Sequence, residues 1–259
     1  MRERVLTVVS VLVTLVVIVV AWKAYVSWYD VSRFLLPPPE DVWRALVDMV
    51  REGSTWHHAY VTTTEVAGGF AIATVAGVAV GVIIAEVRTL ERALTPYLVA
   101  LQVMPKVAII PVLLLWFGFG SGSKLAVAAV FGFFPITTGT IAGLKATEAG
   151  HRDLTRVFEA SRWQRLVVVD LRGAMPTMLT GMEVGIVLAT VGAVVAEYLA
   201  GSEGLGWLAL RSLNQVRIPD LFAVIVLLSV LGVVLYGIIT GLRRLLVPWH
   251  ESARPFEQG

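Results

Sequence analysis

Three ionisable side chains stand inside long apolar stretches and are the first candidates for a functional role. Lys106 lies within 95–119, and Glu183 and Glu197 lie within 173–199. A charge at the centre of a bilayer costs at least ~2.5–3.5 kcal/mol, so these side chains should face protein or a wet cavity. Lys106 beside a solute pathway could attract an anion. The favoured alternative is a structural lysine that pairs with Glu183 or extends along a helix–helix interface. Glu183 and Glu197 likewise could have either a pathway role or a structural role.

Other kinds of chemistry find no support in the residues. The chain has no cysteine, which excludes disulfides, thiolate metal sites and a cysteine nucleophile. Its four histidines have no metal-ligand spacing, and no GxxxxGK[ST] motif is present to bind ATP. The few titratable residues in apolar segments are too scattered for a membrane enzyme. We therefore expect no catalytic residue, no metal and no cofactor in this chain.

Composition places the candidate charges in a membrane protein. Only 15% of the residues are charged, against roughly 25% in soluble domains. The mean hydropathy is +0.78, and a net charge of +2 is too small for a nucleic-acid binder. The predicted fold class is an all-α integral membrane protein with six transmembrane helices, because a span needs about 20 apolar residues. The expected spans are 5–22, 66–85, 95–119, 125–144, 173–199 and 221–242.

These spans divide the chain into regions and set its direction. Most of the 21 Lys and Arg residues fall on one side if both termini are cytoplasmic, as the positive-inside rule favours. Prolines 37–39 are expected to precede a short amphipathic helix on the outer surface, and 201–220 suits a loop or a re-entrant piece. The predicted regions are an N-terminal span (1–30), an extracytoplasmic segment (31–60), a core of five spans (61–245) and a cytoplasmic tail (246–259).

Two features predict how the spans bend and pack. Pro105 and Pro111 should bend the third span, because proline removes backbone hydrogen bonds. Small residues recur four apart in the second and fourth spans, at Gly77 with Gly81 and at Gly139 with Gly143. Such faces let helices approach closely. Packing within the chain is favoured over contact with a second subunit.

The longest internal loop, 145–172, carries a helical pattern of its own. Leu154, Val157, Phe158 and Ser161 recur at helical spacing after Asp153. A short cytoplasmic helix and a plain connector fit this periodicity about equally well. The pattern alone does not say what the loop contacts.

Five segments, taken together, resemble a known family. They read VMPKVAIIPVLLLWFGFGSGSK (103–124), FGFFPITTGTIAGL (131–144), FEASRWQ (158–164), GAMPTMLTG (173–181) and AEYLAGSEGLGWL (196–208). They are similar, in order and spacing, to the integral-membrane permease of bacterial ABC importers of the nitrate, sulfonate and taurine type. The resemblance covers about 30–245. It implies a type I importer-like permease and an acidic residue at Glu197 as a gate or scaffold.

The resemblance also implies a function for the loop. In the family a short helix of this loop, the coupling helix, docks on the cytoplasmic ATPase and transmits its closure. The chain departs from the usual Glu-Ala-Ala start at Asp153, from glycine at Glu159 and from proline at Arg172. The residues expected to contact the ATPase are Asp153, Arg156, Val157, Phe158, Glu159, Ala160, Ser161, Arg162 and Trp163.

Partners and solute follow from the same resemblance. A cytoplasmic ATPase dimer would bind ATP and Mg²⁺, a second permease would complete the pathway as a homodimer, and an extracytoplasmic binding protein would deliver the solute. That solute would be a sulfonate, nitrate, bicarbonate or vitamin precursor carried across a bacterial inner membrane. The alternative function is a stand-alone secondary transporter, which usually shows paired internal repeats; none is convincing here.

Overall fold

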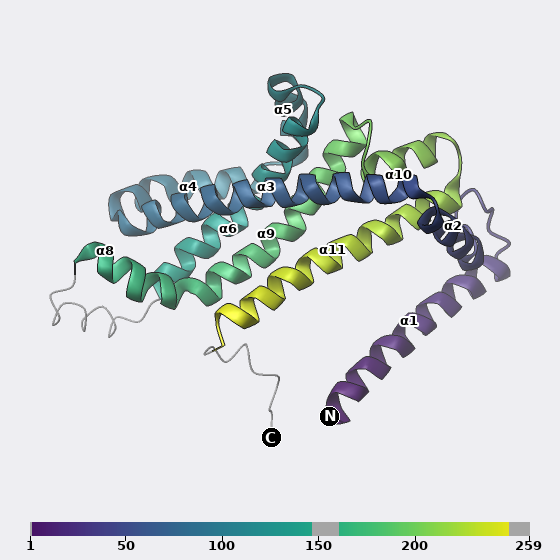
Figure 1. The fold of residues 1–259 in the computed structure, drawn as a ribbon, viewed down its shortest axis with the longest axis horizontal. Coiled ribbons are helices and arrows are strands. Elements are labelled where there is room, and N and C mark those ends of the chain that lie inside the picture. Colours follow the sequence, from purple (N-terminus) through teal and green to yellow (C-terminus); the bar gives the residue numbers. More distant parts are fainter. Residues whose placement is uncertain (1, 147–160, 249–259) are drawn as a thin grey trace.

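The computed structural model describes residues 2–146 and 161–248, and every regular element in these ranges is a helix. The long helices lie obliquely side by side, and short helices cover one end of the bundle (Figure 1). The helices are α1 (Arg2–Trp28), α2 (Pro39–Arg51), α3 (Gly53–Glu86), α4 (Arg88–Val103), α5 (Ile110–Phe117), α6 (Ser121–Ala146), α8 (Arg162–Arg165), α9 (Leu171–Ala200), α10 (Leu205–Asn214) and α11 (Ile218–Leu246).

Five helices of the described chain are long and apolar enough to cross a membrane, and a bent pair adds a sixth candidate. The five are α1, α3, α6, α11 and the continuous stretch that ends with α9. The sixth is α4 followed by Lys106–Phe117. The predicted all-α membrane fold is thereby confirmed.

The third span is sharply broken, whereas the sequence predicts only a bend. α4 and Lys106–Phe117 meet at 90°. Met104, which precedes Pro105, has extended backbone angles (φ −58°, ψ 135°), as expected for a residue held out of the helical region by the following proline ring. Pro111 lies in the first turn of α5, where a missing N–H is tolerated. The break therefore lies at Met104–Pro105, and 95–119 is not one straight helix.

The core is built around α6, which packs between α3 and α9. A side chain could not fit at the closest contacts: a Cβ on Gly81 would lie 2.7 Å from Cβ of Thr140, and one on Gly139 would lie 2.9 Å from Cα of Gly181. The small residues thus serve packing within the chain, as predicted.

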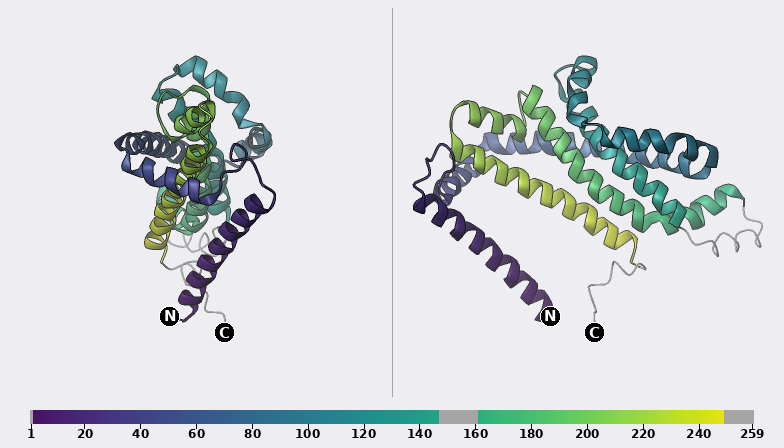
Figure 2. Two further views of the ribbon diagram at one scale, coloured as in Figure 1. Left: turned by 90° about the vertical axis from the view of Figure 1, so that its right-hand side faces the viewer. Right: turned by 180° about the vertical axis from the view of Figure 1, so that it is seen from behind.

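The first helix stands apart from this core. α1 leaves the bundle at α2 (Figure 2), and of its residues with described side chains only Val26 is buried. An ion pair between Lys23 and Glu40 joins α1 to α2. The isolated position of α1 is compatible with lipid on most of its surface.

The amphipathic helix expected after the prolines is α2, and α10 forms within 201–220, where a loop or a re-entrant piece is expected. Val42 and Met49 are buried on α2. Met49 packs in one apolar cluster with Leu205 of α10 and Val224 of α11. A helix can form in this glycine-rich segment because its apolar residues find a face to cover. We call this end of the bundle the α2–α10 end, and the opposite one the α8 end.

Candidate functional site

A buried polar cluster joins three helices at the α2–α10 end, and Glu197 is at its centre. Helix α10 begins with backbone N–H groups that have no partner within the helix. The N–H of Gly206 donates to Glu197 Oε2 at 2.6 Å, and the N–H of Leu205 donates to Thr62 Oγ1 at 2.8 Å. The Gly204 N–H donates to His58 Nδ1 at 3.2 Å. Side chains of α3 and α9 therefore cap α10 and fix it in place.

Glycine at position 204 is required by this cap. Gly204 has a φ of +106°, which other residues rarely adopt, and a Cβ there would lie 2.2 Å from Oε1 of Glu197. The carboxyl group of Glu197 is fully buried against the start of α10, where it accepts the N–H of Gly206. Glu197 is thus placed as a scaffold residue between α9 and α10.

A buried ion pair next to this cluster was not predicted from the sequence. Lys124 Nζ of α6 lies 2.9 Å from Glu65 Oε1 of α3, with side-chain exposures of 5% and 2%. Glu65 lies about one helical turn after Thr62 on α3. Both residues of the ion pair stand immediately before predicted spans, Glu65 before 66–85 and Lys124 before 125–144, so neither is a charge inside an apolar stretch. The sequence signal that could have predicted this pair is their opposite charge at the same depth in two spans.

The other two intramembrane candidates have different partners. Glu183 is buried on α9 and lies 3.0 Å from Arg243 Nη1 of α11, so the pairing of Lys106 with Glu183 is wrong. Lys106 Nζ instead lies 5.5 Å from the ring centre of Phe134, a cation–π distance. Lys106, Glu183 and Glu197 therefore do not form one site.

The predicted ATPase contacts lie mostly outside the described residues. This applies to Asp153, Arg156, Val157, Phe158, Glu159 and Ala160. At the other end of the segment, the Gln164 N–H donates to Ser161 Oγ at 3.2 Å and the Ser161 N–H donates to Gln164 Oε1 at 2.9 Å. This reciprocal pair is a capping box, which starts α8 at Arg162. Trp163 follows with 72% of its surface exposed, so it is available to a partner.

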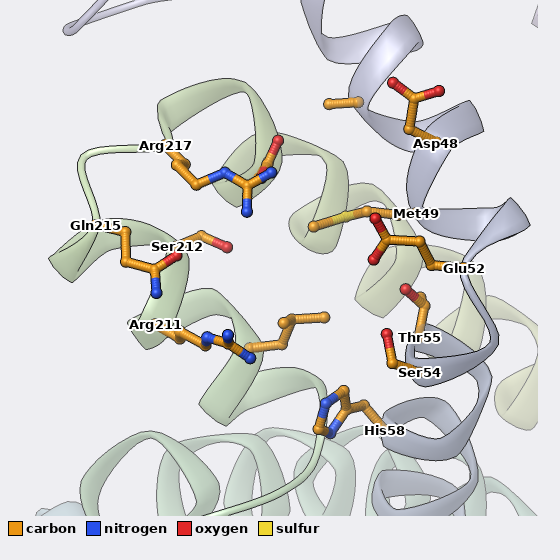
Figure 3. Close-up of a pocket in the computed structure, with 13 residues that line it drawn as sticks. Asp48, Met49, Glu52, Ser54, Thr55, His58, Arg211, Ser212, Gln215 and Arg217 are labelled. Atoms are coloured by element: carbon orange, nitrogen blue, oxygen red, sulfur yellow. The ribbon is translucent and has the colours of Figure 1, made fainter.

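A polar cavity of about 220 Å³ lies at the α2–α10 end. Arg211 and Ser212 project into it from one side, and Glu52 and Thr55 project from the other (Figure 3). Arg211 also lies over the Trp207 ring, 5.3 Å from its centre. Pockets for drug-sized ligands occupy ~300–1,000 Å³, so this cavity suits ordered water better than an organic solute.

The arrangement has the chemistry of a scaffold. Within 2–146 and 161–248, no group of three His, Cys, Asp or Glu side chains could hold a metal ion. The buried carboxylates of Glu65, Glu183 and Glu197 each have a cationic or hydrogen-bonding partner on another helix. The fold and its buried charges define a polytopic membrane protein whose intramembrane polar residues join helices.

Comparison with known proteins identifies the family. Residues 77–249 match the family described as binding-protein-dependent transport system inner membrane component. A riboflavin transport system permease, RibX, of Chloroflexus aurantiacus is 35% identical over 93% of this chain and 90% of its own length. A formylaminopyrimidine transport permease, ThiX, of Halalkalibacterium halodurans is 34% identical (85% and 87%), and a taurine permease, TauC, of Escherichia coli is 27% identical (93% and 90%).

A solved structure shows the same fold. The permease chain matched in inward-facing structures of the MetNI methionine ABC transporter has a TM-score of 0.63 at 17% identity, covering 72% of this chain and 93% of that one. The present chain belongs to the binding-protein-dependent transport inner membrane component family. It is a transmembrane permease subunit of an ABC importer.

Proposed function

We propose that this permease works with a cytoplasmic ATPase dimer, a second copy of itself and an extracytoplasmic binding protein. The family description, which names binding-protein-dependent transport, supports the last partner. ATP and Mg²⁺ are bound by the ATPase, because this chain has no P-loop. Its contact with the ATPase is formed by the segment from Asp153 to Trp163.

This assembly predicts what should copurify from native membranes. A tagged chain should retain an ATPase with a P-loop, and ATP hydrolysis should rise when loaded binding protein is added. Replacing Ala160 with arginine should release the ATPase, because the larger charged side chain would fill the docking groove. A chain that retains no ATPase, or an Ala160→Arg variant that retains it normally, would contradict the proposal.

The α8 end faces the cytoplasm in this proposal, and so do both termini. The free ends of α1 and α11 both point away from the α2–α10 end (Figure 1), which supports placing the termini on one side. The sequence lacks cysteine, so single cysteines can report sidedness without background. A cysteine at Trp163 should react with an impermeant maleimide only from inside, and one at Trp43, which is 65% exposed, only from outside. The reverse pattern would overturn this orientation.

The solute we propose is a heterocyclic vitamin or vitamin precursor, within the wider class of small polar organic solutes. The supporting observation is similarity: the relatives at 34–35% identity are named for riboflavin and formylaminopyrimidine, whereas those named for taurine and nitrate are at 27–28%. Deleting the gene in its own cell should abolish uptake of one of these heterocycles and spare taurine. Loss of taurine uptake alone would contradict the assignment.

Lys106 is the intramembrane residue that we propose for the pathway, and Glu183 and Glu197 act in the scaffold. Lys106 follows the break in the third span, and no acidic side chain of the described chain forms an ion pair with it. Its charge therefore remains available to a polar or anionic solute. Lys106→Gln should raise the KM for uptake without loss of assembly. An unchanged KM would remove Lys106 from the pathway.

A further inference from the structure

Lys145 and Arg165, which lie on either side of the segment that carries the predicted coupling residues, both pair with the same corner of the fold. Lys145 precedes this segment in the last turn of α6, and its Nζ pairs with Glu91 in the first turn of α4. Arg165 follows the segment at the end of α8, and its Nη2 lies 2.9 Å from Glu86 Oε2 at the end of α3. Val87 alone separates α3 from α4. We call the stretch from Glu86 to Glu91 the α3–α4 corner.

Arg165 also connects this corner to the start of the fifth span. Its Nε lies 3.0 Å from Asp170 Oδ2, and the Asp170 side chain is completely buried. Between the two residues the chain forms one π-helical turn, Leu166–Asp170, and such turns are frequent at functional sites. One guanidinium thus joins the stretch that follows the coupling segment to α3 and to the turn that precedes α9, through charge-assisted hydrogen bonds.

Helix α4 has little else to fix its position within the chain. It has no buried residue, and it ends at the 90° break that leads into α5. Isolated surface ion pairs contribute only about 0–1 kcal/mol, so stability alone gives little reason for two pairs to converge here. Their convergence on the start of an otherwise loosely packed helix makes them suited to moving that helix.

We propose that the α3–α4 corner receives the movement of the coupling segment and passes it to the broken span formed by α4 and α5. Arg165 is the positioning residue of this connection, and Lys145 holds its second end. This inference rests on the proposed docking of the coupling segment on an ATPase. Motion of the ATPase would then reach the third span directly through the corner as well as through α9.

Charge reversal at the corner tests the connection. The variants are Glu86→Arg, Arg165→Glu and the two together, which restores an ion pair of opposite sense. The control is Arg92→Glu on α4, because Arg92 forms no ion pair with any described residue. Each is measured in the complete transporter for retained ATPase, thermal midpoint, ATP hydrolysis and solute taken up per ATP.

A reporter on α4 follows the motion itself. Tyr97 is 68% exposed, so an environment-sensitive fluorophore on Tyr97→Cys can be attached to a chain that has no other cysteine. We expect its emission to shift on addition of ATP. The shift should vanish in Glu86→Arg and return in the double variant.

The expected outcome separates coupling from folding and from partner binding. Glu86→Arg should keep its ATPase and thermal midpoint but lose about 5- to 10-fold in solute taken up per ATP, the size of a typical coupling between sites. Arg165→Glu should show the same loss of uptake together with a lower thermal midpoint, because it also puts a second carboxylate beside the buried Asp170. The double variant should recover most of this loss, and Arg92→Glu should behave like the parent chain. Normal uptake per ATP in both single variants, or a fluorophore that ignores ATP in the parent chain, would overturn the inference. A parent chain that retains no ATPase would instead overturn the proposed function.

Discussion

The Thr62 hydroxyl lies 2.6 Å from Oε1 of Glu197 and donates a hydrogen bond that joins α3 to α9. The same hydroxyl oxygen accepts the N–H of Leu205 at the start of α10. Thr62 is completely buried, so one small side chain satisfies polar groups of two other helices where water does not reach. The packing of the α2–α10 end depends on this contact.

Removing the hydroxyl should therefore destabilise the subunit. Thr62→Val keeps the shape but removes the acceptor of the Leu205 N–H and the hydroxyl that donates to Glu197 Oε1, at a cost of about 1–3 kcal/mol. The thermal midpoint of the purified subunit should fall by several degrees, at roughly 2–4 °C per kcal/mol. Thr62→Ser retains the hydroxyl and serves as the control. Equal midpoints for the two variants would show that the hydrogen bonds contribute nothing.

The ion pair of Lys124 with Glu65 should respond differently to single and double substitution. Lys124→Met leaves a buried carboxylate without its cation, which costs about 3–5 kcal/mol. Lys124→Met with Glu65→Leu removes both charges and should recover most of the lost thermal stability. A double variant that is less stable than Lys124→Met alone would contradict this expectation. It would show that the Glu65 carboxylate stabilises the fold through a contact other than Lys124.

Glu183 offers a test of scaffold against pathway. Its bond to Arg243 joins α9 to α11, so Glu183→Gln should lower the thermal midpoint and leave the KM for solute unchanged. Glu203→Gln is the matched control, because Glu203 pairs with His57 at the surface with both side chains more than half exposed. A changed KM at an unchanged midpoint would place Glu183 in the pathway instead.

Replacing glycine with alanine should destabilise the protein only where the glycine packs closely against another helix. Gly139→Ala puts a Cβ 2.9 Å from Cα of Gly181, so α6 and α9 must move apart at a cost of about 1–3 kcal/mol. Gly237→Ala on α11 meets nothing within 4 Å and should be neutral or slightly stabilising. Folded yield after detergent extraction measures both. A Gly139→Ala protein as abundant as the parent would contradict the close α6–α9 contact.

The spans could be predicted because bilayer thickness imposes a length and an apolar composition on each. The break at Met104–Pro105 was only partly predictable: the proline signals a bend, but its angle depends on packing that involves α5 and α6. The prediction for 201–220 stayed between a loop and a re-entrant piece, because glycines and polar residues dominate this segment, and it did not specify the helix α10. Its stability comes from Glu197, Thr62 and His58, which are distant in sequence.

The partners of the buried charges could not be predicted for the same reason. Lys106 and Glu183 are both intramembrane and opposite in charge, which made their pairing reasonable. The structure instead brings Arg243 to Glu183, because α11 packs beside α9. Which charges meet is decided by the arrangement of helices, and a single sequence carries that information only weakly.

Reconstitution into proteoliposomes tests the central claim most directly. The purified permease with its ATPase and binding protein should accumulate solute only when ATP is supplied on the side of the ATPase. Omitting the ATPase, or replacing ATP with a non-hydrolysable analogue, should abolish uptake. Solute transport by the permease alone, with neither ATPase nor nucleotide present, would contradict the account.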